Sequence, residues 1–489
     1  MKKHNLLKVT LLVLLLVVIG SWFLPVSVVN STADGFTTQE SIKIGLFNLA
    51  SYVGIVLQVF GPVIMFVLAV GGLYGVLHKI PQYRILLDKI VSGFEGREWL
   101  FMITVGIIFA VLSSMAGLSV VLLLLFPFVI SVILLMGYDK ITAIMLTVGS
   151  VIAGLIGSVF SANDVYGLSA VFSQTGFENS WILAKTDVIW KIVLLILSLT
   201  LVLINTIMYA KKHQKKDANL EKSYLVPKKV KTDNKKVYPI VIIMDLLLVI
   251  LTLAFISWDL FEVQLFDDLT NELISPTGST FMKGLFGGIN TVLGITIDAT
   301  RGTSNAFGHW SLMEAALAVF VASGALAFAY RKSFNGFINA TGEGVKKALR
   351  PALLVGIAYI VLVCAVTVPF EFSILKNIID VSSGFNLFVM CIVAIVFCFF
   401  TVESYYGVAT AGTYLTVSSV MTNNVGIIAL IWQSMYGLTM LVAPTSVILL
   451  ATLAYTDTSY STWFKTIWKL LLELFALILI ILLIYNGVM

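Results

Sequence analysis

Two carboxylates lie beside interruptions of otherwise apolar stretches of the chain. Asp164 follows the small and hydroxyl residues of positions 157–163, and Glu403 precedes the polar turn 404–407. An ionised group at membrane depth costs about 2.5–3.5 kcal/mol, so such an acid is a candidate for binding a cation, a proton or a substrate amino group. The alternative is structural: Asp164 would lie in water at a helix end, and Glu403 would cap an amide at the turn.

Four interruptions have this character, and they comprise residues 113–119, 157–164, 402–407 and 433–446. They are rich in small and hydroxyl residues and contain no Lys or Arg. A break in a helix exposes unpaired amides and carbonyls, which cost several kcal/mol in lipid unless a partner binds them. Half-helix N-termini attract carboxylates and free carbonyls suit sodium, so we expect the four segments to converge on one binding site.

The candidate site residues are the polar and small residues of these segments. Substrate contacts are predicted from Ser114, Gly117, Ser119, Ser161, Asn163, Ser404, Tyr405, Gln433, Thr445 and Ser446, ion coupling from Asp164 and Glu403, and a possible sodium site near Gly157, Ser158 and Pro444. Because no basic residue is among them, an anionic substrate would depend on helix ends, hydroxyls and co-bound cations. No cofactor other than a sodium ion or proton for coupling is expected.

Other polar residues in the apolar stretches have competing explanations. Gln433 could face a cavity or make a packing hydrogen bond. Tyr405 and Tyr406 could line a pocket, but aromatic residues more often pack in the core or at the lipid interface. Asp245 and Glu473 lie within single predicted spans, where snorkelling or a helix–helix hydrogen bond is the favoured role.

The composition of the 489 residues places these segments in a membrane. Hydrophobic residues make up 59% and charged residues 12%, whereas soluble domains have ~45–50% and ~25%. The chain therefore cannot be a soluble enzyme, a nucleic-acid binder or a disordered protein. Apolar blocks of about 20 residues predict a polytopic integral membrane protein. The three cysteines lie in such blocks and indicate neither a disulfide framework nor a thiol metal site.

The predicted spans alternate with basic segments. The predicted spans are 6–24, 49–77, 141–160, 187–209, 239–258, 310–330, 351–370, 426–455 and 468–485, with a split hairpin at 101–136 and another at 385–420. All but six of the 31 Lys and Arg then fall on one side, which the positive-inside rule identifies as cytoplasmic. We expect a multi-pass plasma-membrane protein with a cytoplasmic N-terminus and an extracellular C-terminus. We expect residues 6–24 to be a retained span rather than a signal peptide, because 21–25 is a poor cleavage site and further spans follow.

The order of these elements recurs along the chain. Span, span, split hairpin, interrupted span and span occur in 1–210 and again in 309–489, separated by a basic cytoplasmic linker at 211–238 and by one span with an extracellular segment at 239–308. An odd number of crossings separates the copies, so the second is inverted. The predicted fold class is an all-α polytopic membrane protein of two inverted repeats, each with a re-entrant hairpin and an interrupted helix. The alternative for a hairpin is two complete spans with a tight outer turn.

Short motifs in both halves resemble a known family. Residues 137–142 (GYDKIT), 443–446 (APTS), 460–465 (YSTWFK) and 21–25 (SWFLP) are similar to motifs of the anaerobic four-carbon-dicarboxylate carrier family of the ion transporter superfamily. The resemblance covers most of the chain and implies secondary uptake or exchange of carboxylates, amino acids or small peptides. This sequence departs from the family pattern at 117–120, 163–165, 403–407 and Val447, so the substrate could differ from that of the family's characterised members.

The hypothesis from sequence is therefore a secondary active transporter for a small organic anion or amino acid. Coupling to sodium or protons, or exchange, would drive it through alternating access. A cation/proton antiporter and a non-transporting membrane receptor or scaffold are the alternatives. No P-loop, HExxH or Ser–His constellation is present, so an enzyme is not expected. The expected partners are the small-molecule substrate, the lipid bilayer and a possible second copy in a homodimer, but no nucleic acid.

Overall fold

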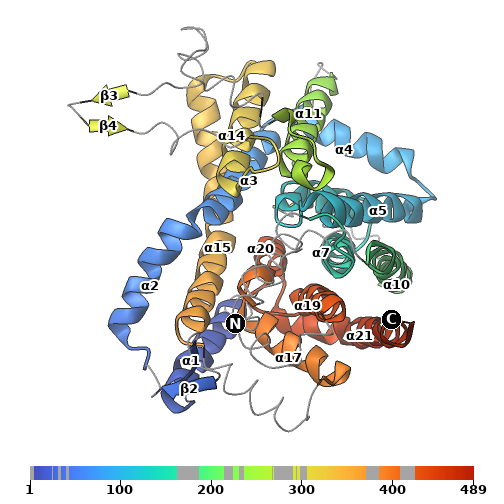
Figure 1. Ribbon diagram of the computed structural model, residues 1–489. Helices are drawn as coiled ribbons and strands as arrows, with labels where there is room; N and C mark the ends of the chain where they lie inside the picture. The colour runs from blue at the N-terminus through green and yellow to red at the C-terminus, as the bar shows by residue number, and fades with distance from the viewer. Residues whose placement is uncertain are drawn as a thin grey trace.

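The computed structural model is a set of helices packed side by side (Figure 1). It describes residues 5–24, 26–30, 35–39, 43–161, 187–213, 224–230, 236–266, 268, 290–292, 295–297, 306–369, 385–407 and 425–488. Eight of the helices in these ranges are long and apolar enough to cross a membrane. This confirms the prediction of a polytopic helical membrane protein.

The helices of the first half begin with α1 and end with α10, and the second half runs from α11 to α21. Their bounds are α1 (Asn5–Phe23), α2 (Leu46–Val59), α3 (Gly61–His78), α4 (Pro81–Gly93), α5 (Glu98–Ala116), η1 (Val121–Leu124), α6 (Phe126–Leu135), α7 (Lys140–Ile156), α10 (Val188–His213), α11 (Tyr238–Phe255), η4 (Trp258–Phe261), α14 (Leu312–Ala329), α15 (Phe334–Thr367), α17 (Leu387–Phe400), α19 (Val425–Met440), α20 (Val447–Thr456) and α21 (Tyr460–Val488). The interruptions predicted after residue 156 and at 443–446 are confirmed by the ends of α7 and α19. Whether symmetry relates the two halves stays a prediction.

Local sequence signals set several helix ends. The Asp139 side chain accepts a hydrogen bond from the Thr142 amide and caps α7, and Ser333 caps α15 in the same way. Such caps satisfy amides that have no partner within the helix. Gly117 ends α5 with φ of 65°, a left-handed conformation that glycine adopts without a steric penalty.

Two expectations about the helices were wrong. The predicted span at 49–77 is two consecutive helices, α2 and α3, that meet at Phe60 just before Pro62. The predicted span beginning at Pro351 starts 17 residues earlier, because the basic segment before it is the first half of the 34-residue helix α15. Pro351 favours a helix start by its geometry, but packing against α3 keeps the preceding residues helical.

That packing is a close crossing of two backbones. Gly71 and Gly75 of α3 face Gly344 and Ala348 of α15, and a Cβ atom at Gly344 would collide with the carbonyl oxygen of Gly71. Small residues at spacing of four let membrane helices approach in this way and gain contact along their length. The small residues of α15 are therefore explained by its close contact with α3, and not by the membrane alone.

The helices form two groups in space that do not follow chain order. The scaffold group is α2, α3, α14 and α15, and the broken-helix group is α5, α6, α7, α10, α17, α19, α20 and α21 (Figure 1). Each group contains helices from both predicted repeats. The predicted sequence domains 1–210 and 309–489 are thus interleaved in the packed molecule, and the domain boundaries stay a prediction.

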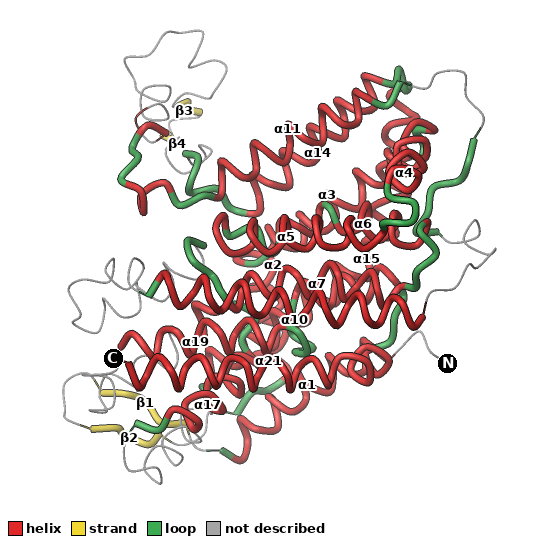
Figure 2. Tube along the Cα trace, turned by 90° about the vertical axis from the view of Figure 1, so that its right-hand side faces the viewer, coloured by secondary structure: helices red, strands yellow, loops and turns green. Residues whose placement is uncertain are grey.

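Segments predicted to be cytoplasmic gather at one end of the helices, here called the basic end. Lys79 lies 2.8 Å from Glu343, and Arg350 lies 2.7 Å from Asp457. Arg84 donates to the carbonyl of Pro227 in the central linker at 3.0 Å. The described termini lie at opposite ends of the helices (Figure 2), and which of them faces the cytoplasm stays a prediction.

Two short hairpins of strands lie outside the helices. β1 (Val26–Asn30) pairs antiparallel with β2 (Gly35–Gln39), and β3 (Asn290–Val292) with β4 (Ile295–Ile297). The predicted all-α fold class did not include these strands. Their β-branched residues favour an extended backbone, and they follow a predicted span in each case.

Candidate functional site

The first break lies where α7 ends inside the protein. Gly157 ends the helix, and a Cβ there would meet the backbone of Leu195 in α10. Leu195 is seven residues inside the start of α10, about 10 Å along that helix. The break is therefore buried within the thickness of the helices rather than at their outer end.

The tip of the first hairpin closes onto this break. The hydroxyl of Ser114 donates to the Gly157 carbonyl at 2.6 Å, and the Ser114 carbonyl accepts from the Val159 amide at 3.0 Å and the Phe160 amide at 3.1 Å. These bonds satisfy backbone groups that the break would otherwise leave unpaired. The first arm, α5, is long enough to cross a membrane whereas the second arm, α6, has only 10 residues, so the choice between a re-entrant hairpin and two complete spans stays a prediction.

The broken helix of the second half crosses the first at the same place. Gln433 of α19 donates to the carbonyl of Ser158 at 2.7 Å, and Gly437 lies against the backbone of Ile156. The side chain of Gln433 is 2% exposed. Gln433 could have faced a cavity or made a packing hydrogen bond. The structure shows a hydrogen bond, and this bond joins the two halves.

The break between α19 and α20 is closed by side chains from α21. Trp463 donates its indole N–H to the Leu441 carbonyl at 3.0 Å, and the Tyr460 hydroxyl donates to the Val442 carbonyl. Thr445 donates to the Phe399 carbonyl at 2.8 Å, and Ser446 caps α20 by accepting from the Leu449 amide. The YSTWFK motif therefore has a physical role, which is to satisfy the carbonyls of this break.

Glu403 lies between the second hairpin and the scaffold group. Its Oε1 accepts a hydrogen bond of 2.8 Å from the Tyr359 hydroxyl of α15. The Tyr359 ring stacks on Phe60 with centroids 4.2 Å apart, and Phe60 also contacts the edge of Tyr406. The aromatic residues hold the donor in place, so the carboxylate makes a fixed contact between the two helix groups.

The remaining predicted residues are dispersed. Ser119 is half-buried near the hairpin tip, Ser161 forms a bridge with Ile256, and Ser404 is buried. Tyr405 is 36% exposed and packs edge-on against Tyr406. Asn163, Asp164 and the second arm of the second hairpin, 408–420, lie outside the described residues. Among those described, no three His, Cys, Asp or Glu gather into a metal site.

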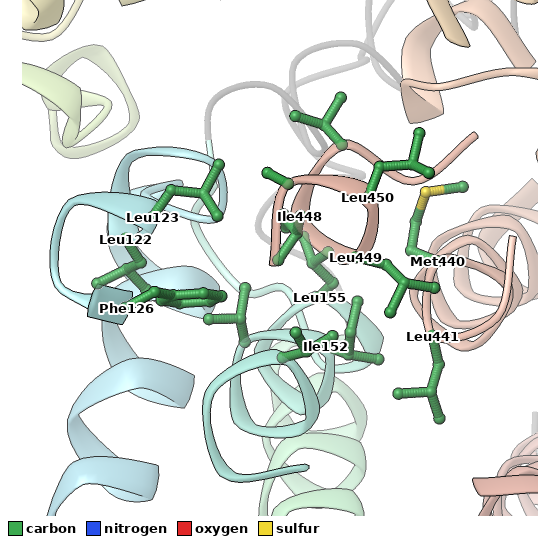
Figure 3. Packing of buried hydrophobic residues seen from close by; sticks show 14 of the residues in the cluster. Leu122, Leu123, Phe126, Ile152, Leu155, Met440, Leu441, Ile448, Leu449 and Leu450 are labelled. Carbon is green, nitrogen blue, oxygen red and sulfur yellow. The ribbon is translucent and has the colours of Figure 1, made fainter. Parts of the chain in front are cut away.

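Apolar packing fixes the breaks against one another. The first hairpin, α7 and α20 share a buried core, and Figure 3 shows its side chains Leu122, Phe126, Ile152, Leu155, Ile448 and Leu449. Asn205 and Glu473 add a helix–helix hydrogen bond of 2.8 Å between α10 and α21, which confirms that predicted role for Glu473. The elements that carry the candidate residues thus form a single packed unit.

The family of this protein follows from comparison with known proteins. Residues 6–487 match the family model of DcuC, the C4-dicarboxylate anaerobic carrier.

The chain belongs to this family. It is a membrane transporter and not an enzyme, and the family suspected from the motifs is confirmed. Among solved structures, the YdaH transporter of Alcanivorax borkumensis is similar over 99% of this chain and 98% of that chain, with 14% sequence identity and a TM-score of 0.43. A comparison with curated proteins finds no match.

In this transporter a cavity opens between the two helix groups at the basic end. It has a volume of about 60 Å³ and lies between α3 and α15 on one side and α6 and α20 on the other. Tyr224 of the central linker lies at its mouth. Burial raises the pKa of Tyr224 to about 12, and the Asp457 carboxylate adds to the rise while Arg350 opposes it.

Several residues of this site could not be identified from the sequence. Tyr359 lies within a predicted span, and nothing near it in the sequence indicates a polar contact. Only the tertiary structure brings its hydroxyl to the Glu403 carboxylate. His78 and Lys347 carry no local sequence signal that sets them apart, yet both line the cavity. Trp463 and Tyr460 did carry a signal, since they belong to a motif shared with the family.

Proposed function

We propose that this transporter moves a small carboxylate-bearing substrate across the plasma membrane, coupled to sodium or protons or by exchange. The observation that carries the proposal is the crossing of the two broken helices, where Gln433 reaches Ser158 beside the Ser114–Gly157 contact. Helix ends and breaks of this kind are where secondary transporters bind carboxylates and coupling ions. The family's description as a carrier of C4-dicarboxylates supports the substrate class.

Movement of the broken-helix group against the scaffold group would give alternating access. By the positive-inside rule, the basic end would face the cytoplasm. The cavity there would then belong to a state that is open to the cytoplasm. Two of the polar contacts that join the groups are Tyr359 with Glu403, and Arg350 with Asp457. Both would break as the groups slide past each other.

Glu403 is the described residue best placed to respond to a coupling ion. A proton or sodium ion at its carboxylate would compete with the Tyr359 hydroxyl and loosen the contact with the scaffold group. Asp164 keeps its predicted role in ion coupling. The cytoplasmic N-terminus, the extracellular C-terminus and assembly as a homodimer also belong to this proposal.

Transport assays in proteoliposomes test it. Purified protein is reconstituted, and uptake of labelled succinate and of a labelled amino acid is followed under an inward sodium gradient, an inward proton gradient, or with unlabelled substrate inside. We expect saturable uptake of a carboxylate that depends on at least one of these conditions. Ion flux without any organic substrate would favour the antiporter instead, and absence of flux with ligand-induced thermal stabilisation would favour a receptor.

A further inference from the structure

A groove at the basic end lies between the segment 224–230 of the central linker and the ends of α3 and α15. It has a volume of about 820 Å³, which is much larger than the adjoining cavity between the helix groups. Gly75, Gly344 and Lys347 line both of them, so the groove leads from the basic end to that cavity. A space of this volume can hold a small organic molecule.

The linker side of the groove is held in place by the helices beneath it. The Leu225 carbonyl accepts from the Ser131 hydroxyl of α6 at 2.8 Å, and the Pro227 carbonyl accepts from Arg84 of α4 at 3.0 Å. Leu225 is also fully buried. Lys228 follows these anchored residues directly, so its place in the lining of the groove depends on a fixed stretch of backbone.

The lysines give the groove a positive charge. Lys79, Lys228 and Lys347 line it, and Glu343 is the only carboxylate among the described residues that do so. Glu343 lies 2.8 Å from Lys79, and the charges of this pair cancel. Lys228 and Lys347 are exposed, and neither makes an ion pair with another described residue. Two positive charges therefore remain to attract an anion, because a cleft focuses the field of the charges that line it.

These two lysines favour a dianion over a monoanion. One of them belongs to the linker and the other to α15, so a molecule with a carboxylate at each end has an opposite charge for each. The four helix breaks contain no Lys or Arg, so the groove supplies a charge that the breaks lack. Each contact is weak because both amines are exposed, which suits a site that a substrate enters and leaves.

We infer that this groove is an entry site where a dianionic dicarboxylate binds, attracted by Lys228 and Lys347, before it reaches the helix breaks. The inference rests on the proposed function only for the claim that the bound molecule is then transported. Binding in the groove can be measured without transport.

Protection of an engineered thiol from a neutral maleimide tests the inference in phosphatidylcholine nanodiscs. Val230→Cys places the thiol in the groove lining, where the side chain is exposed, and the three native cysteines are buried. We expect succinate to slow the modification. With Lys347→Gln or Lys228→Gln added, half-protection should need about two- to fivefold more succinate, the effect of one exposed charge pair. Lys346→Gln and Lys229→Gln are matched controls, since these adjacent lysines are exposed and absent from the lining, and they should change little.

Several results would overturn the inference. Equal protection in all four lysine variants would show that the two lining lysines have no special role. Protection by butyrate as strong as that by succinate would show that the second carboxylate adds nothing, and equal protection by sulfate would show that the groove attracts any dianion. Loss of the succinate effect in nanodiscs with phosphatidylglycerol would assign the groove to anionic lipid headgroups. Protection should also weaken as potassium chloride is raised, because salt screens exposed charges, and protection that is independent of salt would contradict electrostatic attraction.

Uptake by the same Val230→Cys protein in proteoliposomes separates this inference from the proposed function. Succinate uptake without protection of the thiol would reject the entry site and leave the proposed function intact. Protection that depends on the two lysines, without uptake of any carboxylate, would support the binding site and reject the proposed function.

Discussion

Gln433 of α19 donates a hydrogen bond of 2.7 Å to the carbonyl of Ser158, two residues beyond the last residue of α7. The bond joins the broken helices of the two halves at the depth where the hairpin tip also closes. Both residues are buried, so the bond lies away from water.

The first prediction concerns this bond. Gln433→Leu keeps the size of the side chain but removes its hydrogen bond to the Ser158 carbonyl, so we expect a loss of about 1–3 kcal/mol in unfolding free energy and reduced uptake. Ser434→Ala is the control on the next residue, because its hydroxyl bonds only to carbonyls of its own helix. Equal effects of the two changes on stability and uptake would argue against a special role for the crossing.

The second prediction separates ion coupling from capping at Glu403. Glu403→Gln can still accept the Tyr359 hydrogen bond but cannot bind a proton or attract sodium. We expect near-normal thermal stability and a loss of the dependence of uptake on the ion gradient. Asp245→Asn, an exposed acid on α11, should leave that dependence unchanged. Retained gradient dependence in Glu403→Gln would show that the carboxylate is only a structural acceptor.

The third prediction concerns the crossing of α3 and α15. Gly344→Ala places a methyl group against the backbone of Gly71, so we expect destabilisation of about 1–3 kcal/mol or more from overpacking. Gly342→Ala, two residues earlier on the same helix, has open space around the new Cβ and should be neutral or slightly stabilising. Thermal unfolding in detergent measures both. Similar melting temperatures for the two variants would contradict the close approach.

The fourth prediction compares two ion pairs at the basic end. Arg350 and Asp457 join the scaffold group to α20, and because both are partly exposed, Arg350→Gln should cost no more than about 1 kcal/mol of stability. If the two groups separate during transport as proposed, this variant should raise the rate of substrate exchange, because the state described here loses a contact. Glu343→Gln removes the pair with Lys79, which lies within the scaffold group, and should leave the rate unchanged. An unchanged rate in Arg350→Gln would mean that the groups do not separate there.

The fifth prediction concerns the central linker. Leu225 is fully buried, and its carbonyl accepts from the Ser131 hydroxyl at 2.8 Å, whereas Val230 is 54% exposed. Leu225→Asp should release this segment and speed tryptic cleavage after Lys228 and Lys229. Val230→Asp adds the same charge without removing a buried contact and should not. Mass spectrometry of the fragments follows both, and equally fast cleavage of the two would show that burial does not protect the linker.

The spans and breaks were largely predictable because the membrane imposes simple rules. A backbone in lipid must be helical, and breaks need small and polar residues, so positions 157 and 443–446 were recognisable from composition alone. The length of α15 was not, because its basic first half resembles a loop. Its helical state depends on Gly71 and Gly75, which lie more than 260 residues earlier in the chain.

For the candidate site, too, some features could be recognised from the sequence and others depend on the tertiary structure. The sequence identified Ser114, Gly157, Gln433 and Thr445 as residues of the breaks, and the structure places them there. It could not assign their partners, and most of them bond to backbone carbonyls of other segments. Such pairings depend on which helices cross, and no local pattern encodes a crossing.

The sequence by itself determined three things about this protein. They are its location in a membrane, the positions at which its helices are interrupted, and the family to which it belongs. These follow from hydropathy, from the cost of unpaired backbone in lipid and from short motifs, all of which act locally. Only the tertiary structure decided that Tyr359 meets Glu403, and that His78 and Lys347 line one cavity. Those contacts come from packing between helices distant in sequence, whose close approach depends on small residues on both partners.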